Sequence, residues 1–200
     1  MAPPRAAPFP RASARLRAAM DRRPSPAAPT MLAVVDMGSN SFRLEIGRVE
    51  GGQVYRLDTV RETLRMGAGL DERDNLTPLA QREAIACLAR FGERLRGFDR
   101  AAVRAVATNT FRVAKNVGRF LSRAEAALGF PIDVIAGHEE ARLIYLGVAH
   151  VLPANDTPRL VVDIGGGSTE FIIGRGMNRE RLESLKLGCV TMTRRFFADG

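Results

Sequence analysis

The stretch Leu160-Val-Val-Asp-Ile-Gly-Gly-Gly-Ser-Thr-Glu-Phe-Ile-Ile-Gly174 decides the fold of this chain. Its two ends, 160–162 and 171–173, are short β-rich apolar runs typical of buried strands, and three glycines lie between them. Because glycine lacks a Cβ atom, the turn can take positive φ and let successive N–H groups converge on an anion such as phosphate. The stretch therefore predicts a strand, a phosphate-binding turn and a second strand.

Two carboxylates, Asp163 and Glu170, flank this turn. They would repel a bare phosphate, so their presence indicates a divalent cation or a polarised water held between them. A dinucleotide fingerprint or a P-loop should lead into a helix, whereas this chain continues with strand character and has no lysine directly after the glycines. The remaining alternative for this stretch alone is an ordinary hairpin whose glycines serve only the turn.

A related unit lies 127 residues earlier, at Val34-Val-Asp-Met-Gly-Ser-Asn-Ser-Phe-Arg-Leu-Glu-Ile-Gly47. It aligns without gaps to Val161–Gly174, and seven of the 14 positions are identical, including Asp36 with Asp163. The spacing exceeds the repeat length of solenoids, which is about 20 to 50 residues. The duplication therefore indicates two related lobes whose hairpins face each other across a cleft and grip a phosphate chain from both sides.

Composition places the chain among globular proteins. Its 200 residues, 46% of them hydrophobic, can bury one complete domain and part of another. No run of about 18 apolar residues is present, so a membrane span is not expected. Cys87 and Cys189 have no metal-ligand or redox spacing, which favours a reducing, cytoplasmic location.

Residues 1–30 form a distinct segment rich in Pro, Ala and Arg, which predicts a disordered tail. Six arginines and one aspartate in this segment account for five of the eight net positive charges. The remaining excess of three suits a small polyanion and does not favour specific binding of nucleic acid. Met31 directly precedes the first expected strand, so either Met1 or Met31 starts the chain.

The order of elements after residue 30 predicts an α/β fold. Three antiparallel strands come first, and helices and strands then alternate. Strands are expected at 32–36, 42–49, 54–60, 102–107 and 132–135, and helices from Thr77 and at 110–115, 117–128 and 137–150. This order is that of a ribonuclease H-like lobe, which we assign to residues 31–152.

Residues 153–200 are expected to begin a second lobe of the same kind. After its hairpin we expect a strand near 182–187 and a helix from Cys189. Only 26 residues follow Gly174, fewer than a lobe comparable to the first would need. We therefore expect the second lobe to be incomplete and the chain to be a fragment of a longer protein.

Candidate catalytic residues lie where the helix from Gly137 begins. Glu139 or Glu140 would orient or deprotonate water near a bound phosphate, but neighbouring positions on a helix point apart and the spacing does not choose between them. Acidic residues there also stabilise a helix without any further role. Since the chain has no visible catalytic triad or paired cysteine nucleophile, water is the expected nucleophile, and Cys87 is assigned to packing.

Three arginines are candidates for phosphate binding. Arg43 and Arg112 follow turns that are expected to face the cleft, and Arg65 lies in a glycine loop. Guanidinium groups bind phosphate oxygens bidentately. For each arginine taken singly, a solvated surface position is the alternative.

Four motifs together resemble the exopolyphosphatase and guanosine pentaphosphate phosphohydrolase family. They are Val35-Asp-Met-Gly-Ser-Asn-Ser-Phe-Arg-Leu44, Ala107-Thr-Asn-Thr-Phe-Arg112, Gly137-His-Glu-Glu-Ala-Arg142 and Val162-Asp-Ile-Gly-Gly-Gly-Ser-Thr-Glu170. The resemblance extends over residues 31–200 in the same order. It implies the superfamily of actin, sugar kinases and heat-shock chaperone ATPases, with phosphate bound between two lobes.

The resemblance assigns a role to individual residues. Glu140 matches the catalytic glutamate that prepares water, and Asp163 and Glu170 match carboxylates that hold a metal and water. Glu170 is therefore assigned a catalytic role beside Glu140. Asp36 matches the carboxylate of the first loop, so Mg²⁺ or another divalent cation is implied. The two phosphate loops correspond to Gly38, Ser39, Asn40 and Ser41, and to Gly165, Gly166, Gly167 and Ser168. His138 departs from the family, which more often has Asn or Glu there.

The resulting hypothesis is a phosphoanhydride hydrolase that releases terminal orthophosphate from inorganic polyphosphate. Guanosine pentaphosphate is the alternative substrate within the same family. A non-hydrolysing polyphosphate or nucleotide sensor and an ATP-dependent sugar kinase or chaperone-type ATPase are the alternatives from other classes. No membrane or specific nucleic acid partner is expected, and the full-length protein would be able to form a homodimer.

Overall fold

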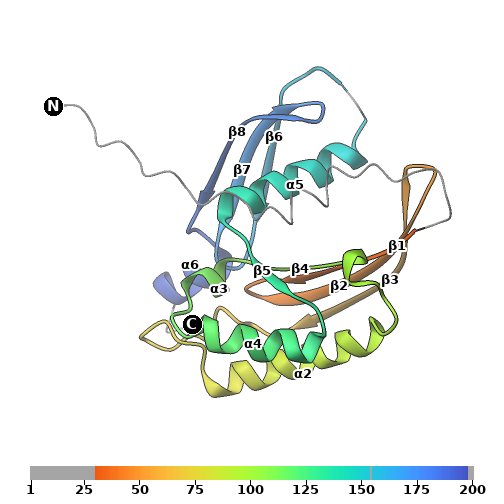
Figure 1. Ribbon diagram of the computed structural model, residues 1–200. Coiled ribbons are helices and arrows are strands. Elements are labelled where there is room, and N and C mark those ends of the chain that lie inside the picture. The colour runs from red at the N-terminus through yellow and green to blue at the C-terminus, as the bar shows by residue number, and fades with distance from the viewer. Residues whose placement is uncertain (1–29, 154, 198–200) are drawn as a thin grey trace.

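The computed structural model describes residues 30–153 and 155–197, which form two β-sheets with helices around them (Figure 1). Apart from Thr30, the predicted tail lies outside the described residues. The first sheet has the order β3-β2-β1-β4-β5 and the second has the order β6-β7-β8. Their strands are β1 (Thr30–Met37), β2 (Ser41–Glu50), β3 (Gln53–Thr63), β4 (Val103–Ala107), β5 (Ile132–Val134), β6 (Arg159–Ile164), β7 (Thr169–Arg175) and β8 (Asn178–Leu185).

The first sheet has the ribonuclease H-like order predicted from the sequence. β1, β2 and β3 form the antiparallel meander, and β4 and β5 join it in parallel through helical crossovers. The helical elements are α2 (Pro78–Arg94), η1 (Arg100–Ala102), α3 (Asn109–Val113), α4 (Val117–Leu128), α5 (Gly137–Val151) and α6 (Cys189–Phe196). Each predicted helix is present, with boundaries that differ by a residue or two.

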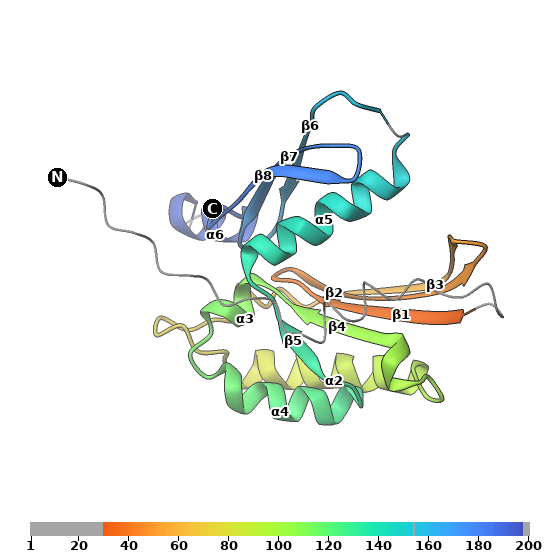
Figure 2. The ribbon, with the colours of Figure 1, turned by 45° about the horizontal axis from the view of Figure 1, so that its top comes forward.

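Helices α2 and α4 lie together on one face of the first sheet (Figure 2). Strand alternation supplies that face: Val35 and Met37 of β1 are buried in the core, whereas Asp36 between them points to the opposite face. Thr77 caps α2 by accepting a hydrogen bond from Ala80 N, as its position before Pro78 predicts. Cys87 is fully buried in this helix, and burial raises the pKa of its thiol to about 12, so its assignment to packing is confirmed.

Helix α5 follows the first sheet in the chain but packs on the second. Its buried residues Ala141, Tyr145 and Ala149 form a small cluster with Ile172 of β7. Figures 1 and 2 both show α5 between the two sheets. The boundary between lobes at residue 152, which assigns α5 to the first lobe by sequence, remains a prediction.

The expectation that both strands of the second hairpin are buried is wrong for β6. None of its residues is buried, and Leu160, Val162 and Ile164 are exposed. The reason is that α5 covers only one face of this sheet within the described residues. No helix in the described part of the chain is both long and apolar enough to cross a bilayer.

Candidate functional site

The two glycine turns have the same hydrogen-bond geometry and meet tip to tip. Gly38 N donates to Ser41 O at 3.1 Å, and Gly165 N donates to Ser168 O at 2.9 Å. A Cβ atom on Gly166 would lie 3.2 Å from Ser39 Cβ, so the second turn is in contact with the first. The structure therefore brings together the two loops that sequence analysis assigned to phosphate binding.

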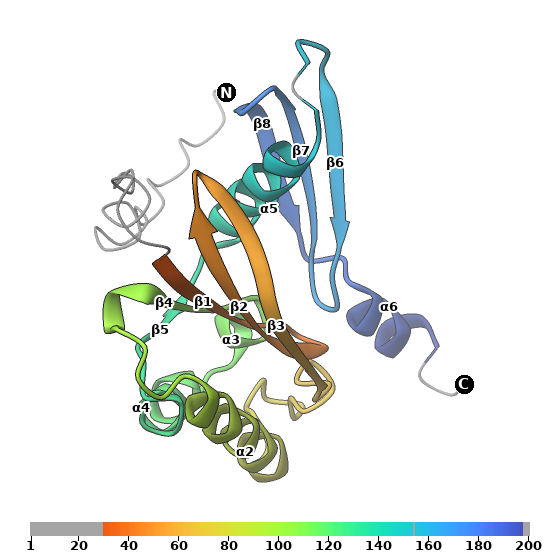
Figure 3. The same cartoon turned by 90° about the vertical axis from the view of Figure 1, so that its right-hand side faces the viewer.

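Gly166 and Gly167 of the second turn are required for close approach to other segments, whereas a Cβ atom on Gly165 would meet Ser168 of the same turn. The turn does not use the positive φ that glycine allows, because Gly165, Gly166 and Gly167 are not among the glycines with positive φ in the described chain. A Cβ atom on Gly167 would overlap the side-chain amide of Asn109 in α3. Gly188, which precedes α6, approaches the backbone of this turn equally closely, and Figure 3 shows α6 just beyond the tips of β6 and β7.

Each sheet carries a row of three polar side chains beside its turn. In the second sheet Asp163 pairs with Glu170, and Glu170 pairs with Ser184 on β8. Glu170 is only 1% exposed, and its Oε1 accepts a hydrogen bond from Ser184 Oγ at 2.8 Å. The equivalent row of the first sheet consists of Asp36, Arg43 and Arg61.

The two glutamates in the first turn of α5 bind different arginines. Glu139 is held by Arg142 one turn further along, through Nε to Oε2 at 2.8 Å and Nη2 to Oε1 at 2.6 Å. Glu140 Oε2 instead accepts from Arg112 Nη1 at 2.8 Å, and the same nitrogen donates to Ile135 O at 2.9 Å. The choice between the two glutamates, which spacing left open, therefore falls on Glu140.

The surroundings of Glu140 make it a stronger base than an ordinary glutamate. Burial raises the pKa of its carboxyl group to about 7; the hydrogen bond from Arg112 opposes this rise, and Glu170 and Asp36 add to it. The pKa of Asp36 is also raised by the protein around it, although its side chain is open to solvent, with Arg43 opposing and Asp163 adding to the rise. Asp36, Asp163, Glu140 and Glu170 thus form one electrostatically coupled group.

The other predicted phosphate ligands already have protein partners. Ser41 Oγ accepts from Arg61 Nε at 3.1 Å, and Arg43 Nη1 lies 3.2 Å from Glu45 Oε1. Arg112 binds Glu140 as described. Ser39 and Ser168 are buried at the two turns, and Asn40 O accepts the N–H groups of residues 64 and 65. His138 lies 3.7 Å from Glu183 Oε2, measured from its Nε2, and so faces β8.

The acidic residues fit a divalent cation only in part. Among the described residues, no three His, Cys, Asp or Glu side chains are grouped closely enough to form a metal site. Asp163 and Glu170 are nonetheless cross-strand neighbours. Mg²⁺ is often bound by one or two carboxylates, with substrate phosphates and water completing its shell. Asp163 and Glu170 therefore fit the one or two carboxylate ligands that a protein supplies to such a site.

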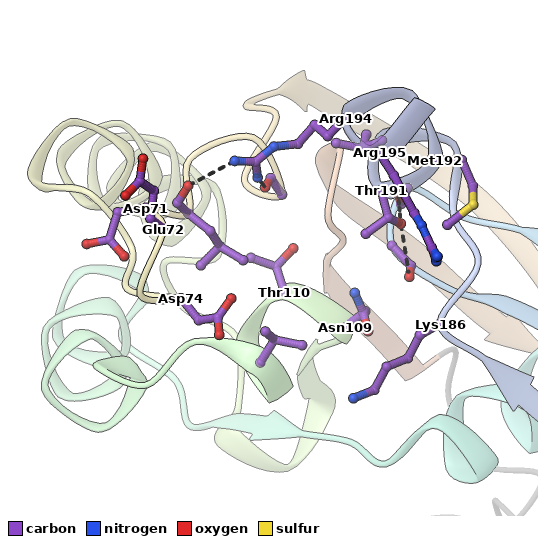
Figure 4. Close-up of a pocket in the computed structure, with 16 residues that line it drawn as sticks. Asp71, Glu72, Asp74, Asn109, Thr110, Lys186, Thr191, Met192, Arg194 and Arg195 are labelled. Atoms are coloured by element: carbon purple, nitrogen blue, oxygen red, sulfur yellow. Dashed lines mark hydrogen bonds between the residues drawn. The ribbon is translucent and has the colours of Figure 1, made fainter. Parts of the chain in front are cut away.

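A hollow lies on the other side of the second turn (Figure 4). Its wall includes Gly166, Gly167 and Asn109 but none of the four coupled carboxylates. Several of its charged groups are engaged elsewhere: Arg194 Nη1 donates to Gly67 O at 2.8 Å, and Asp74 Oδ2 lies 3.6 Å from Lys115 Nζ. We therefore place the chemistry at the carboxylates and assign no function to this hollow.

Sequence reasoning missed two residues of this region, Ser184 and Asn109. Ser184 lies on an ordinary strand, and its contact with Glu170 spans 14 positions of the chain. Asn109 belongs to a motif that was quoted for the resemblance, yet its contact with Gly167 joins segments far apart in sequence. Register counted from the pair Arg175 and Asn178 would place Glu183 opposite Glu170, and the irregularity between Ile173 and Gly174 moves Ser184 there instead.

Comparison with known proteins agrees with this architecture. The profile of the Ppx/GppA phosphatase family matches residues 46–200. The PPX-GPPA enzyme of Aquifex aeolicus is 34% identical with a TM-score of 0.73, and the match covers 84% of this chain and 56% of that one. An exopolyphosphatase from Cytophaga hutchinsonii is 30% identical with a TM-score of 0.78, covering 84% and 54%.

This chain therefore spans little more than half the length of these relatives. A chain of the PilM-PilN type IV pilus biogenesis complex, 12% identical with a TM-score of 0.53, shares the fold alone. The mixed sheet flanked by helices is that of the superfamily of actin, sugar kinases and heat-shock chaperone ATPases. On this evidence of sequence and fold, the chain belongs to the Ppx/GppA phosphatase family.

Proposed function

We propose that this chain contributes to a phosphoanhydride hydrolase that processively releases orthophosphate from the end of inorganic polyphosphate. The observation that carries the proposal is Glu140, a partly buried carboxylate that binds Arg112, interacts electrostatically with Glu170 and Asp36, and has a pKa raised to about 7. A general base is most effective when its pKa lies near the working pH. Membership of the Ppx/GppA family supports a phosphatase; the substrate and the mechanism are our proposal.

In the proposed reaction the terminal phosphate lies between the turns at Gly38–Ser41 and Gly165–Ser168. Glu140 accepts a proton from water while the water oxygen bonds to phosphorus. The bond from phosphorus to the bridging oxygen breaks, and the shortened chain leaves as an anion. Arg112 is the nearby cation that would share its charge between Glu140 and the phosphate.

Asp163 and Glu170 would hold a divalent cation together with phosphate oxygens. Such a cation, when bound, supplies positive charge that offsets the charge of the phosphates. Asp36 lies within the same electrostatic group and would support this binding. Guanosine pentaphosphate ends in the same kind of linkage, so the same apparatus would act on its 5′ terminus.

The test is phosphate release from long-chain polyphosphate and from guanosine pentaphosphate, measured for the wild type and for Glu140→Gln. Glu139→Gln is the matched control, because Glu139 is held by Arg142. We expect Glu140→Gln to lower kcat by about 100- to 10,000-fold and Glu139→Gln to change it only slightly. The ratio of the two wild-type rates decides the preferred substrate.

Three outcomes would contradict the proposal. Equal kcat for Glu140→Gln and the wild type would remove Glu140 as the base. Tight binding of polyphosphate by the wild type without any phosphate release, in the presence of Mg²⁺, would instead favour the non-hydrolysing sensor. ATP-dependent transfer to a sugar, or release from ATP alone, would favour the kinase or chaperone-type ATPase.

A further inference from the structure

Ser184 lies where three parts of the site meet. It is on β8, and its Oγ donates to Glu170 Oε1 at 2.8 Å. A Cβ atom on Gly137, the first residue of α5, would come within 2.7 Å of Ser184 Cβ. Gly137 is three residues before Glu140. A single serine therefore contacts one proposed catalytic glutamate and the helix start that carries the other.

The hydrogen bond to Glu170 matters because that side chain is only 1% exposed. A buried carboxylate requires donors in place of water, and a donor fixes the rotamer as well as the charge. Among the described residues, Ser184 is the side chain that donates to Glu170. The hydroxyl binds Oε1 of the carboxylate.

Ser184 also lies in close contact with Gly137 at the start of α5. Because Gly137 has no side chain, the start of α5 can approach Ser184 directly. Arg112 then links the same helix start to α3, through its bond to Glu140. The position of Glu140 relative to Glu170 is thus determined at the Ser184 side chain.

We propose that Ser184 is a positioning residue that orients Glu170 and sets its separation from Glu140. This inference rests on the proposed hydrolase function. It differs from a role in holding substrate, since Ser184 lies on β8 and is not part of either glycine turn. Removing its hydroxyl should therefore slow the chemical step and leave the binding of the phosphate chain nearly unchanged.

The first test compares Ser184→Ala, Ser184→Thr and the wild type in full-length protein, with long-chain polyphosphate as substrate. We expect Ser184→Ala to lower kcat by about 10- to 100-fold, as losses of supporting hydrogen bonds commonly do. KM should change little, and Ser184→Thr should restore most of kcat because it keeps the hydroxyl. Ser122→Ala, the same change on α4, is the control and should leave kcat unchanged.

The second test needs neither activity nor metal. Urea unfolding midpoints are measured in metal-free buffer for Ser184→Ala, Glu170→Met, which removes the acceptor, and the double variant. Since each single change removes the same hydrogen bond, the effects should be non-additive. Additive effects would overturn the proposed contact.

The outcomes separate this inference from the proposed function. If the wild type releases phosphate and Ser184→Ala has the same kcat, the positioning role is wrong and the proposed function stands. If kcat falls only in proportion to a lowered melting temperature and Thr does not restore it, Ser184 serves folding alone and the inference is wrong. If the wild type releases phosphate from neither substrate, the proposed function fails and this inference fails with it.

Discussion

The two hairpins of this protein share one backbone turn and differ in the side chains beside it. Both turns close with an N–H to carbonyl bond across three residues, from Gly38 and from Gly165. At the aligned positions that follow, the first hairpin has Arg43 and the second has Glu170. Arg43 lowers the pKa of Asp36, its cross-strand partner, whereas Glu170 lies opposite a second acid, Asp163.

This difference indicates that the duplicated hairpins kept the same backbone turn but came to carry side chains of opposite charge beside it. The first row, with two arginines beside one acid, suits contact with an anion. The second row, with two acids and a hydroxyl, suits a cation or an oriented water. In the proposed hydrolase, the arginine row would contact the phosphate and the acidic row would contact a cation or the attacking water.

The largest expected effect comes from removing the charge that distinguishes the rows. Glu170→Gln should lower kcat for polyphosphate by about 100- to 10,000-fold, within the range for loss of a catalytic carboxylate. Arg43→Gln, at the aligned position, should act mainly on KM because Arg43 is exposed and already pairs with Glu45. Steady-state kinetics of both variants measure this, and similar losses of kcat would show that the rows are equivalent.

The next largest effect is expected at Gly167, a position where the second turn requires glycine and the first does not. A Cβ atom on Gly167 would overlap the Asn109 amide, while the aligned position of the first turn accommodates Asn40. Gly167→Ala should therefore displace the hairpin from α3 and lower kcat/KM by about 100-fold, as a displacement of about 1 Å can do. Asn109→Ala removes the overlapping atoms, so the double variant should recover part of the loss; no recovery would mean that another contact is responsible.

The pH dependence of kcat should shift when Arg112 is substituted. Glu140 acts as a base only when deprotonated, so kcat should rise with pH around a midpoint near its pKa of about 7. Arg112 lowers that pKa, so Arg112→Gln should move the rising limb to higher pH, and Arg112→Lys should move it less. A pH–rate profile at saturating polyphosphate measures the shift, and an unchanged midpoint would exclude Glu140 as the titrating group.

The same raised pKa predicts how stability depends on pH. Folded Glu140 holds its proton up to about 7, whereas an unfolded glutamate releases it near 4.5. The contribution of this group to folding stability is therefore fully present below the pKa of the unfolded state. It is lost as pH rises through the pKa of the folded state. Melting temperatures of the wild type and Glu140→Gln in metal-free buffer should converge at low pH and separate towards neutral pH, with the variant more stable; parallel curves would contradict this.

The smallest difference between the two hairpins is expected in the stability of variants at the shared glycines, Gly38 and Gly165. A Cβ atom on Gly38 would lie 3.0 Å from Ser41 O, and one on Gly165 would lie 3.0 Å from Ser168 O. Gly38→Ala and Gly165→Ala should each destabilise the protein by about 1 to 3 kcal/mol, the usual range for overpacking. Their melting temperatures should agree closely, and clearly unequal values would show that the turns are not mechanically equivalent.

Local patterns were sufficient for the elements of this fold. The apolar alternation, the cap at Thr77 and the duplicated hairpin predicted the meander, the crossover helices and the ribonuclease H-like order. The burial of β6 was not predictable in this way. An apolar run indicates a strand, but the neighbour that covers each face comes from a distant part of the chain.

What the sequence determined by itself was the set of hairpins, helices and candidate residues, because turn chemistry and periodicity act over a few neighbouring positions. The tertiary structure decided which glutamate is bound by Arg112, that Gly166 and Gly167 lie against distant segments, and that Ser184 donates to Glu170. Each of these depends on a contact between segments far apart in the chain. Such contacts depend on how whole elements pack, and no local pattern specifies them.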